Sequence, residues 1–184
     1  RPRVQVGLAG GLGTHAAYLD TGATYNTVSR STMHAAGGGD YPFYLNNADW
    51  NLVTDSYVQN LTAGYGARIE GSDSNTVRRS TVVADSAADV AVRIYNSDSN
   101  LLVDSFVRNA LGHGVHVINT SKFNTVLRST ITTGAAAAAG RYGLYINDAS
   151  SNTVLDSYVQ GSTGVYVSMS TGTVIGGSVL VSTN

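Results

Sequence analysis

A short phrase recurs along the whole chain at almost constant spacing, and this repetition constrains the fold more than any other feature. In the copy that begins at Asn75, the asparagine precedes two strand-forming residues, and Ser80 follows five positions after it. Six copies begin at Asn26, Asn51, Asn75, Asn100, Asn124 and Asn152, and a degenerate seventh begins at Gly172. Successive copies start 25, 24, 25, 24, 28 and 20 residues apart. Periods of roughly 20 to 50 residues are typical of repeat proteins in which each repeat forms one layer.

A second phrase precedes each asparagine phrase, as in GARI at 66–69 and GVHV at 114–117. Apolar residues alternate with other residues in it, and this period of two favours strands over helices. One repeat therefore predicts three short strands: the second phrase, the residues after the asparagine and the residues after the serine. Leucine-rich and helical repeats do not fit, because the dense leucine consensus and the 3.6-residue pattern that they need are missing.

These repeats, over roughly residues 15–181, resemble those of the pectate-lyase-like β-helix family, which also includes alginate epimerases and phage tailspike shafts. The resemblance implies an all-β fold, a right-handed single-stranded parallel β-helix (β-solenoid) of about seven coils with three short strands each. We expect a single domain over residues 1–184. Because the chain starts at Arg1 rather than at Met, we also expect it to be a segment of a longer protein.

Equivalent residues of stacked coils are expected to form ladders, because adjacent strands of a sheet lie ~4.8 Å apart. Apolar residues of the first strand should point inward, and the asparagines should bond to one another between coils. At the corner before each serine, the residues alternate in charge: Arg30, Asp55, Arg79, Asp104, Arg128 and Asp156. Alternation replaces repulsion between coils with attraction, so we expect this ladder to specify register more than to stabilise the fold.

Composition excludes several classes of function. The 11 Lys and Arg residues nearly balance the 12 Asp and Glu residues, so the net charge of −1 predicts no nucleic-acid partner. No apolar run approaches the ~18 residues of a transmembrane helix, so we expect no membrane insertion. The chain has no cysteine, which excludes disulfides and thiolate metal sites. We expect neither a metal nor another cofactor.

The resemblance implies that an active groove would lie on the outward face of the first strand of each coil. The residues at this position form one row of phenols, cations and an imidazole: Tyr18, Tyr44, Arg68, Arg93, His116, Tyr145 and Tyr166. An enzyme that acts on polyuronates must neutralise a sugar carboxylate, remove a proton and supply another. The row contains residue types suited to each of these steps.

In this hypothesis Arg68 and Arg93 bind the carboxylate through paired donors, His116 is the base near its ordinary pKa of ~6.5, and Tyr145 is the acid. The substrate-binding residues would then be Tyr44, Arg68, Arg93, Tyr145 and Tyr166. The alternative interpretation is structural, because Tyr and Arg are common on exposed strand faces, where they stack through cation–π contacts.

Other features argue against catalysis. The row contains no carboxylate, and the nearest acids, such as Glu70, Asp89 and Asp148, are expected as single residues in turns. Most turns are short, so we expect no deep cleft. His113 and His116 are three residues apart, but we expect a turn and a strand to keep them from converging as metal ligands. An ice-binding role is also disfavoured, because leucines interrupt the row of threonines on the second strand.

The sequence therefore predicts a non-catalytic segment of an extracellular or phage-surface protein, structural or adhesive, with some capacity to contact polysaccharides. The alternative is a polyuronate lyase or C5-epimerase that acts from the first-strand row. Neither end of the sequence offers a helix or a charged plug to cover the terminal strands, and exposed strand edges invite pairing. We therefore expect homo-oligomers or filaments that form through the ends.

Overall fold

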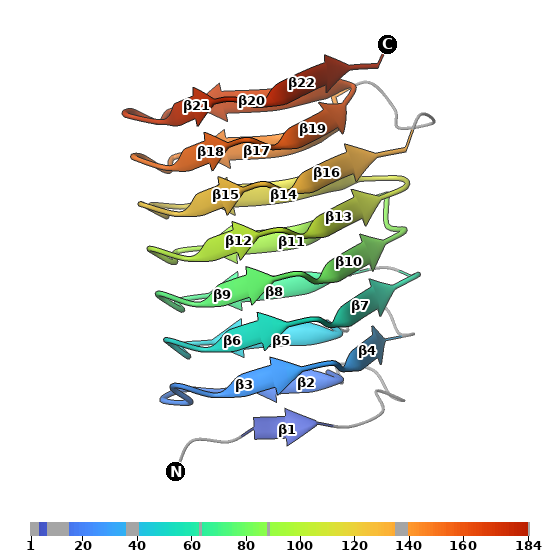
Figure 1. Cartoon of the computed structure of the whole chain (residues 1–184), viewed down its shortest axis with the longest axis vertical. Helices are drawn as coiled ribbons and strands as arrows, with labels where there is room; N and C mark the ends of the chain where they lie inside the picture. Colours follow the sequence, from blue (N-terminus) through green and yellow to red (C-terminus); the bar gives the residue numbers. More distant parts are fainter. Residues whose placement is uncertain are drawn as a thin grey trace.

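The computed structural model describes residues 4–6, 15–35, 41–62, 64–87, 89–134 and 140–183 of the chain. In these ranges every regular element is a β-strand, and the strands form three sheets of eight, seven and seven strands around one long axis (Figure 1). No helical segment in the described ranges has the length and hydropathy to span a membrane.

The three sheets are named A, B and C in the order in which each coil visits them. Sheet A contains β1 (Val4–Val6), β2 (Ala17–Leu19), β5 (Phe43–Asn46), β8 (Ala67–Glu70), β11 (Val90–Tyr95), β14 (His113–Ile118), β17 (Tyr142–Asn147) and β20 (Thr163–Ser168). Sheet B contains β3 (Thr27–Ser29), β6 (Leu52–Thr54), β9 (Thr76–Arg78), β12 (Leu101–Val103), β15 (Thr125–Leu127), β18 (Thr153–Leu155) and β21 (Val174–Gly176). Sheet C contains β4 (Thr32–Ala35), β7 (Tyr57–Asn60), β10 (Thr81–Ala84), β13 (Phe106–Asn109), β16 (Thr130–Thr133), β19 (Tyr158–Gly161) and β22 (Val179–Ser182).

Each strand of a coil pairs in parallel with the equivalent strands of the coils before and after it, so the repeat sets the register. In sheet B, for example, Thr76 lies between Leu52 and Leu101, which occupy the same position of the repeat. The predicted parallel β-helix with three short strands per coil is confirmed. The coil count differs slightly, because the chain completes about six turns and the seventh set of strands, β20–β22, is the last layer.

Strand β1 is the exception to the parallel arrangement. It pairs antiparallel with β2, and Val4 lies opposite Leu19. The residues Val4–Val6 form a strand, but they do not begin a further coil. Instead β1 lies along the first edge of sheet A, where it supplies the hydrogen bonds that a preceding parallel strand would otherwise supply.

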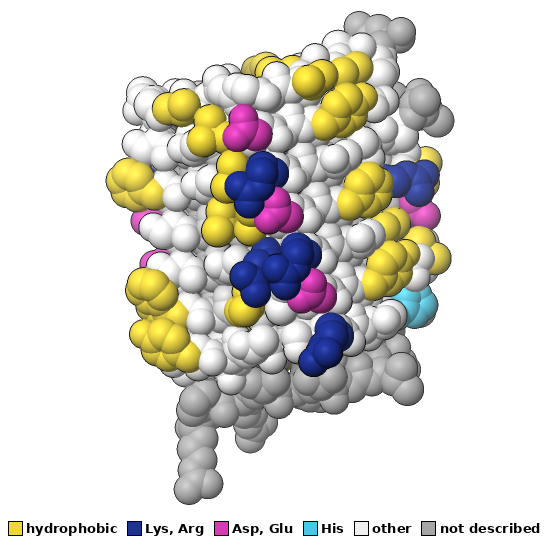
Figure 2. All heavy atoms as spheres, viewed as in Figure 1, with side chains coloured by type: hydrophobic (Ala, Val, Ile, Leu, Met, Phe, Trp, Pro, Cys, Tyr) yellow, Lys and Arg dark blue, Asp and Glu magenta, His cyan; other side chains and the backbone are white. Residues whose placement is uncertain are grey.

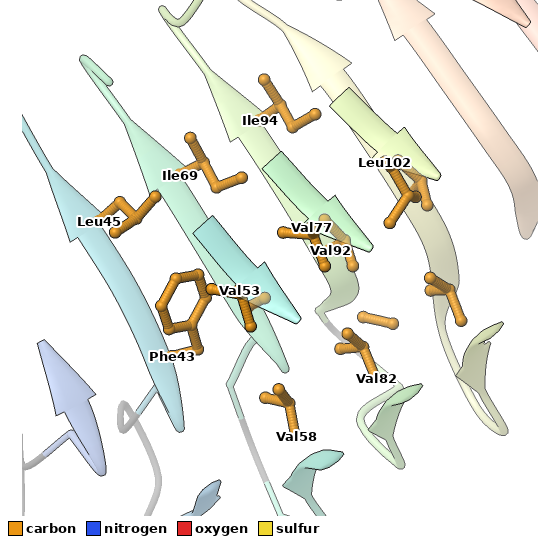
Figure 3. Packing of buried hydrophobic residues seen from close by; sticks show 14 of the residues in the cluster. Phe43, Leu45, Val53, Val58, Ile69, Val77, Val82, Val92, Ile94 and Leu102 are labelled. Atoms are coloured by element: carbon orange, nitrogen blue, oxygen red, sulfur yellow. The ribbon is translucent and has the colours of Figure 1, made fainter. Parts of the chain in front are cut away.

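Aliphatic and aromatic side chains from all three sheets fill the centre of the coils (Figure 3). Phe43 and Leu45 of β5 are each 1% exposed, and Ile94 of β11 is 2% exposed. The inward first-strand ladder predicted from the sequence is buried from β2 to β17. In β20, Val167 is 39% exposed, because no coil of the described chain stacks on that layer.

The asparagine ladder is buried and bonded in both directions, as expected. The Oδ1 atom of Asn75 accepts hydrogen bonds from the backbone N–H and the Nδ2 of Asn51, at 2.8 and 3.1 Å. The Nδ2 of Asn75 donates to the Oδ1 of Asn100 at 3.2 Å and to the carbonyl oxygen of Ala48 at 2.9 Å. Because polar groups buried without partners are costly, this bonding favours one alignment of successive coils.

Serine side chains form two comparable ladders. The N–H of Ser80 donates to the Oγ of Ser105 at 3.2 Å, while the Oγ of Ser80 donates to the carbonyl oxygen of Arg78 at 2.8 Å. The second ladder was not anticipated from the sequence. In it the N–H of Ser72 donates to the Oγ of Ser97 at 3.0 Å. Both ladders satisfy backbone groups where the chain bends between sheets.

The charged corner residues form a ladder between sheets B and C, visible as alternating basic and acidic side chains in Figure 2. They adopt left-handed backbone angles, with φ of 48° at Arg30 and 53° at Asp55. Arg79 donates to both carboxylate oxygens of Asp55, at 2.7 and 2.9 Å. Arg128 donates in the same way to Asp104, at 2.7 and 3.0 Å. The predicted alternation thus produces two ion pairs within the described ranges, in which Arg79 and Arg128 bind the acid of the preceding coil.

Candidate functional site

The outward residues predicted as a site form one continuous row on sheet A. Strand pairing places them side by side in the order Tyr18, Tyr44, Arg68, Arg93, His116, Tyr145 and Tyr166. Six of these residues are half-buried, and Tyr166 is 42% exposed. They can lie together because parallel in-register pairing brings residues about 24 positions apart in sequence to within one strand spacing.

A second column of rings, not anticipated from the sequence, runs beside this row. Its members are His15, Tyr41, Tyr65, His113 and Tyr142. The ring centroids of His15 and Tyr41 are 5.2 Å apart, those of Tyr41 and Tyr65 are 5.3 Å apart, and all three rings stack. The signal in the sequence is a ring three residues before five of the seven row residues, as in YPFY at 41–44 and YGLY at 142–145.

Glu70 lies next to the row, and the expectation that it is a turn residue is wrong. It is the last residue of β8, two positions after Arg68, so strand alternation puts both side chains on the same face. Arg68 Nη2 lies 2.7 Å from Glu70 Oε2, and the Tyr44 hydroxyl donates to the same oxygen at 2.6 Å. Arg68 Nη1 donates to the Tyr41 hydroxyl at 2.9 Å. One of the two predicted carboxylate-binding arginines is therefore already paired.

Arg93, by contrast, forms no ion pair within the described ranges. Its Nη1 donates a hydrogen bond to the Tyr65 hydroxyl. Its guanidinium carbon also lies 5.2 Å from the ring centroid of Tyr65 and 4.7 Å from that of Tyr95. Aromatic faces stabilise the cation without neutralising it, so Arg93 leaves a positive charge on this part of sheet A.

His113 and His116 lie together, and the expectation that His113 belongs to the turn before the strand is wrong. Both belong to β14, and their ring centroids are 4.6 Å apart. The Nδ1 of His113 accepts a hydrogen bond from the N–H of Tyr142 at 3.1 Å. The Nε2 of His116 is buried without a hydrogen-bond partner. Within the described ranges, no three His, Asp or Glu side chains are grouped so that they could hold a metal ion.

Burial controls the protonation of the two predicted proton-transfer residues. Desolvation lowers the pKa of His116 to about 3, and the nearby His113 and Arg93 contribute to the same shift. Burial also raises the pKa of Tyr145, with smaller contributions from neighbouring tyrosines. The sequence suggested an imidazole near its ordinary pKa, whereas the folded chain keeps a weakly basic imidazole beside a weakly acidic phenol.

Tyr44 shows the same behaviour in the other half of the row. Desolvation raises its pKa, and the hydrogen bond to the Glu70 carboxylate adds to the increase. Burial also raises the pKa of Tyr18, so Tyr18, Tyr44 and Tyr145 stay protonated at neutral pH and present ring faces and hydroxyl groups rather than phenolates. Such a surface can stack on apolar faces of a ligand, donate hydrogen bonds and attract a negative charge at Arg93.

Comparison with known proteins agrees with this architecture. The family described as "Right handed beta helix region" matches residues 16–180, which is most of the chain, and the protein belongs to that family. A solved structure from Parabacteroides merdae ATCC 43184, described as a "putative glycosyl hydrolase", is similar with a TM-score of 0.54. It shares 8% sequence identity over 79% of this chain and 80% of that chain, a level at which the likeness shows the fold alone. No curated protein sequence matches the chain significantly.

Proposed function

We propose that this β-solenoid binds acidic polysaccharides along the outer face of sheet A without catalysing their cleavage. In this proposal it is a structural or adhesive segment of an extracellular or phage-surface protein. The observation that carries the proposal is the position of Arg93, a cation without an ion-pair partner in the described ranges, over the rings of Tyr65 and Tyr95, on a face where His116 is a weak base and Tyr145 a weak acid. Membership of the β-helix family and the name of the solved relative support a role with carbohydrates.

The two halves of the face would contribute differently to binding. Around Arg93 the guanidinium supplies the charge that a uronate carboxylate needs. Towards the last coils, Tyr145 and Tyr166 stack with ring centroids 5.6 Å apart and Tyr142 stacks on Tyr166 at 4.9 Å. Ring faces of this kind accept the C–H faces of sugars. Because the row is continuous along the long axis, a linear polymer fits it better than a single sugar does.

The lyase or C5-epimerase alternative uses the same residues but requires one of them, His116, to transfer a proton. His116 lies between Arg93 and Tyr145 in the strand register, the order that the alternative requires. In that alternative His116 would also have to accept a proton from a carbon atom of the sugar. An imidazole with a pKa of about 3 is a weak base for that step. Binding without turnover is therefore the function that the geometry favours.

Calorimetric titration with hexamers of mannuronate and galacturonate tests the proposal. Arg93→Gln should weaken binding of an acidic hexamer by about tenfold or more, because a charge-assisted hydrogen bond is lost. Arg108→Gln, on the exposed face of β13 in sheet C, is the matched control and should bind like the parent chain. Binding should also weaken as salt increases.

Two results would contradict the proposal. One is the absence of binding to either acidic hexamer, or equal losses in both arginine variants. The other is turnover, seen as absorbance of unsaturated uronates or as altered epimer content by NMR, that His116→Ala abolishes. The second result would establish the enzymatic alternative on the same face.

A further inference from the structure

Sheet B carries a shallow groove on a different face of the solenoid from the row just described. Its volume is about 580 Å³, within the range of about 300–1,000 Å³ common for small-molecule sites. One side is formed by Tyr25 and Trp50, at the corner that precedes the sheet B strands. The other side is formed by the charged corner residues Asp104 and Arg128. Figure 2 shows hydrophobic side chains at one edge of this face and the charged column beside it.

Tyr25 and Trp50 form an exposed aromatic platform. Their ring planes differ by 16°, and their centroids are 6.2 Å apart. Tyr25 is 75% exposed and Trp50 is 56% exposed, so neither ring stabilises the core. Large apolar side chains exposed side by side usually mark a binding surface in a soluble protein.

The corner does not require aromatic residues. Tyr25 and Trp50 have φ of 58° and 59°, and the equivalent Ser74, Ser99 and Ser151 have φ of 58°, 59° and 59°. Serine therefore adopts the same left-handed conformation in three other coils, and it does so without exposing an aromatic ring. Strained or costly features that the fold does not need are candidates for function. The platform is best explained by a ligand that stacks on it.

The rest of the groove combines an apolar floor with one carboxylate, Asp104, and two guanidinium groups, Arg78 and Arg128. Half-buried Leu52, Leu101 and Leu127 form the floor. At the rim, Asp104 and Arg128 are paired at 2.7 Å, and both side chains are partly exposed, at 40 and 54%. The groove therefore offers aromatic rings, an aliphatic floor and hydrogen-bond donors and acceptors at its rim. These groups together suit a molecule that has C–H faces and many hydroxyl groups.

We propose that this groove is a second saccharide site and that its ligand is a neutral sugar chain. A hydroxyl group both donates and accepts, so it can bond to an Asp–Arg pair without separating the two charges. A polyanion would meet the Asp104 carboxylate as well as the guanidinium groups of Arg78 and Arg128, whereas the hydroxyl groups of a neutral sugar can bond to all three side chains. A neutral chain stacks one sugar on the Tyr25–Trp50 platform and reaches the Asp104–Arg128 pair across the leucine floor. This site is independent of the acidic-glycan function proposed for sheet A.

Trp50 makes the proposal directly measurable, because it is the single tryptophan of the chain. Its fluorescence is followed during titration of the full chain with neutral hexasaccharides of glucose, mannose and xylose. We expect a saturable change in emission with at least one of them and none with a mannuronate hexamer. Tyr25→Ala should weaken that response by about tenfold, because half of the stacking platform is removed.

Phe123→Ala is the matched control. Phe123 is 60% exposed, occupies the equivalent corner with φ of 57°, and does not line the groove, so this variant should bind like the parent chain. Arg93→Gln should also leave the response unchanged, which separates this site from sheet A. The proposal is overturned if no neutral hexasaccharide changes the emission at about 10 mM, well above the ~1 mM Kd of a weak site. It is overturned equally if Phe123→Ala or Arg93→Gln weakens binding as much as Tyr25→Ala does.

Discussion

His116 should remain neutral in the folded chain over the pH range in which an ordinary histidine titrates. Its pKa is about 3 in the folded chain, whereas an unfolded imidazole titrates near ~6.5. Between these two values the unfolded chain binds a proton that the folded chain does not bind. The free energy of unfolding therefore decreases as the pH falls from about 6.5 towards 3, with a slope from this residue of at most about 1.4 kcal/mol per pH unit.

Urea unfolding at pH 7 and pH 5, on the parent chain and on His116→Asn, checks this prediction. The parent chain should lose more stability between the two pH values than the variant does. Burial also lowers the pKa of His113, so the variant should keep part of the dependence. Equal losses in both chains would mean that His116 is accessible to protons in the folded state.

Asn100 offers a test of the asparagine ladder. Its Oδ1 accepts from the N–H of Asn75 at 2.9 Å, and its Nδ2 donates to the carbonyl oxygen of Ser72 at 2.9 Å. Asn100→Ala leaves these buried groups without partners, so we expect a loss of about 3 kcal/mol in the free energy of unfolding. Asn26→Ala, at the half-buried end of the ladder, should cost clearly less in the same urea titration. A similar cost at both positions would contradict a bonded ladder.

Single residues also show what the sequence can and cannot reveal about the site. The row from Tyr18 to Tyr166 could be predicted because the repeat fixes the register. Glu70 was named but assigned to a turn, because its column changes residue type from coil to coil and shows no repeated letter. The burial of His116 depends on rings contributed by other coils, among them Tyr145 at a centroid distance of 5.0 Å. A pattern within one repeat contains no information about such contacts.

At the scale of the structural element, the charged corner ladder predicts how the stability of the solenoid responds when the charge of one corner side chain is reversed. Asp104→Arg removes the partner of Arg128 and places three arginines in succession, since Arg79 occupies the preceding coil. We expect a lower melting temperature, with a larger decrease at low ionic strength because exposed charges are screened by salt. Combining it with Arg128→Asp restores one opposite pair and should recover most of the loss. Identical melting curves for the parent and Asp104→Arg at low salt would show that the pair does not influence stability.

The positions of the strands could be predicted where the repeat is present. Outside the repeat, the pairing direction of a strand could not be predicted. The residues after each asparagine and each serine alternate in burial, and β9 and β10 begin at the positions that the phrase indicates. The orientation of β1 was not predictable, because VQV alternates in the same way whether its partner is parallel or antiparallel. Direction is set by the neighbouring strand β2, and no local pattern encodes it.

At the scale of the whole molecule, the two ends of the described solenoid differ. Strand β1 covers the first edge of sheet A, whereas Ile175 and Leu180 at the last layer are 40 and 46% exposed at positions that are buried in other coils. We expect self-association through the last layer, visible in sedimentation velocity as a larger species at higher concentration. Leu180→Glu should reduce it, and Phe106→Glu, an exposed residue in the middle of sheet C, should not. A monomer at every concentration would contradict this expectation.

The stacking of coils also determines how the molecule carries load. Strands β1 and β22 lie at opposite ends of the long axis (Figure 1), and the backbone hydrogen bonds between coils run along that axis. Tension between the two ends is therefore carried by every interface between coils in series, and each coil of about 24 residues adds about 80 Å of extended chain when it is released. The force that the solenoid withstands is set by its weakest single interface. A longer array of the same repeats would extend the reach of the molecule without making it any stronger.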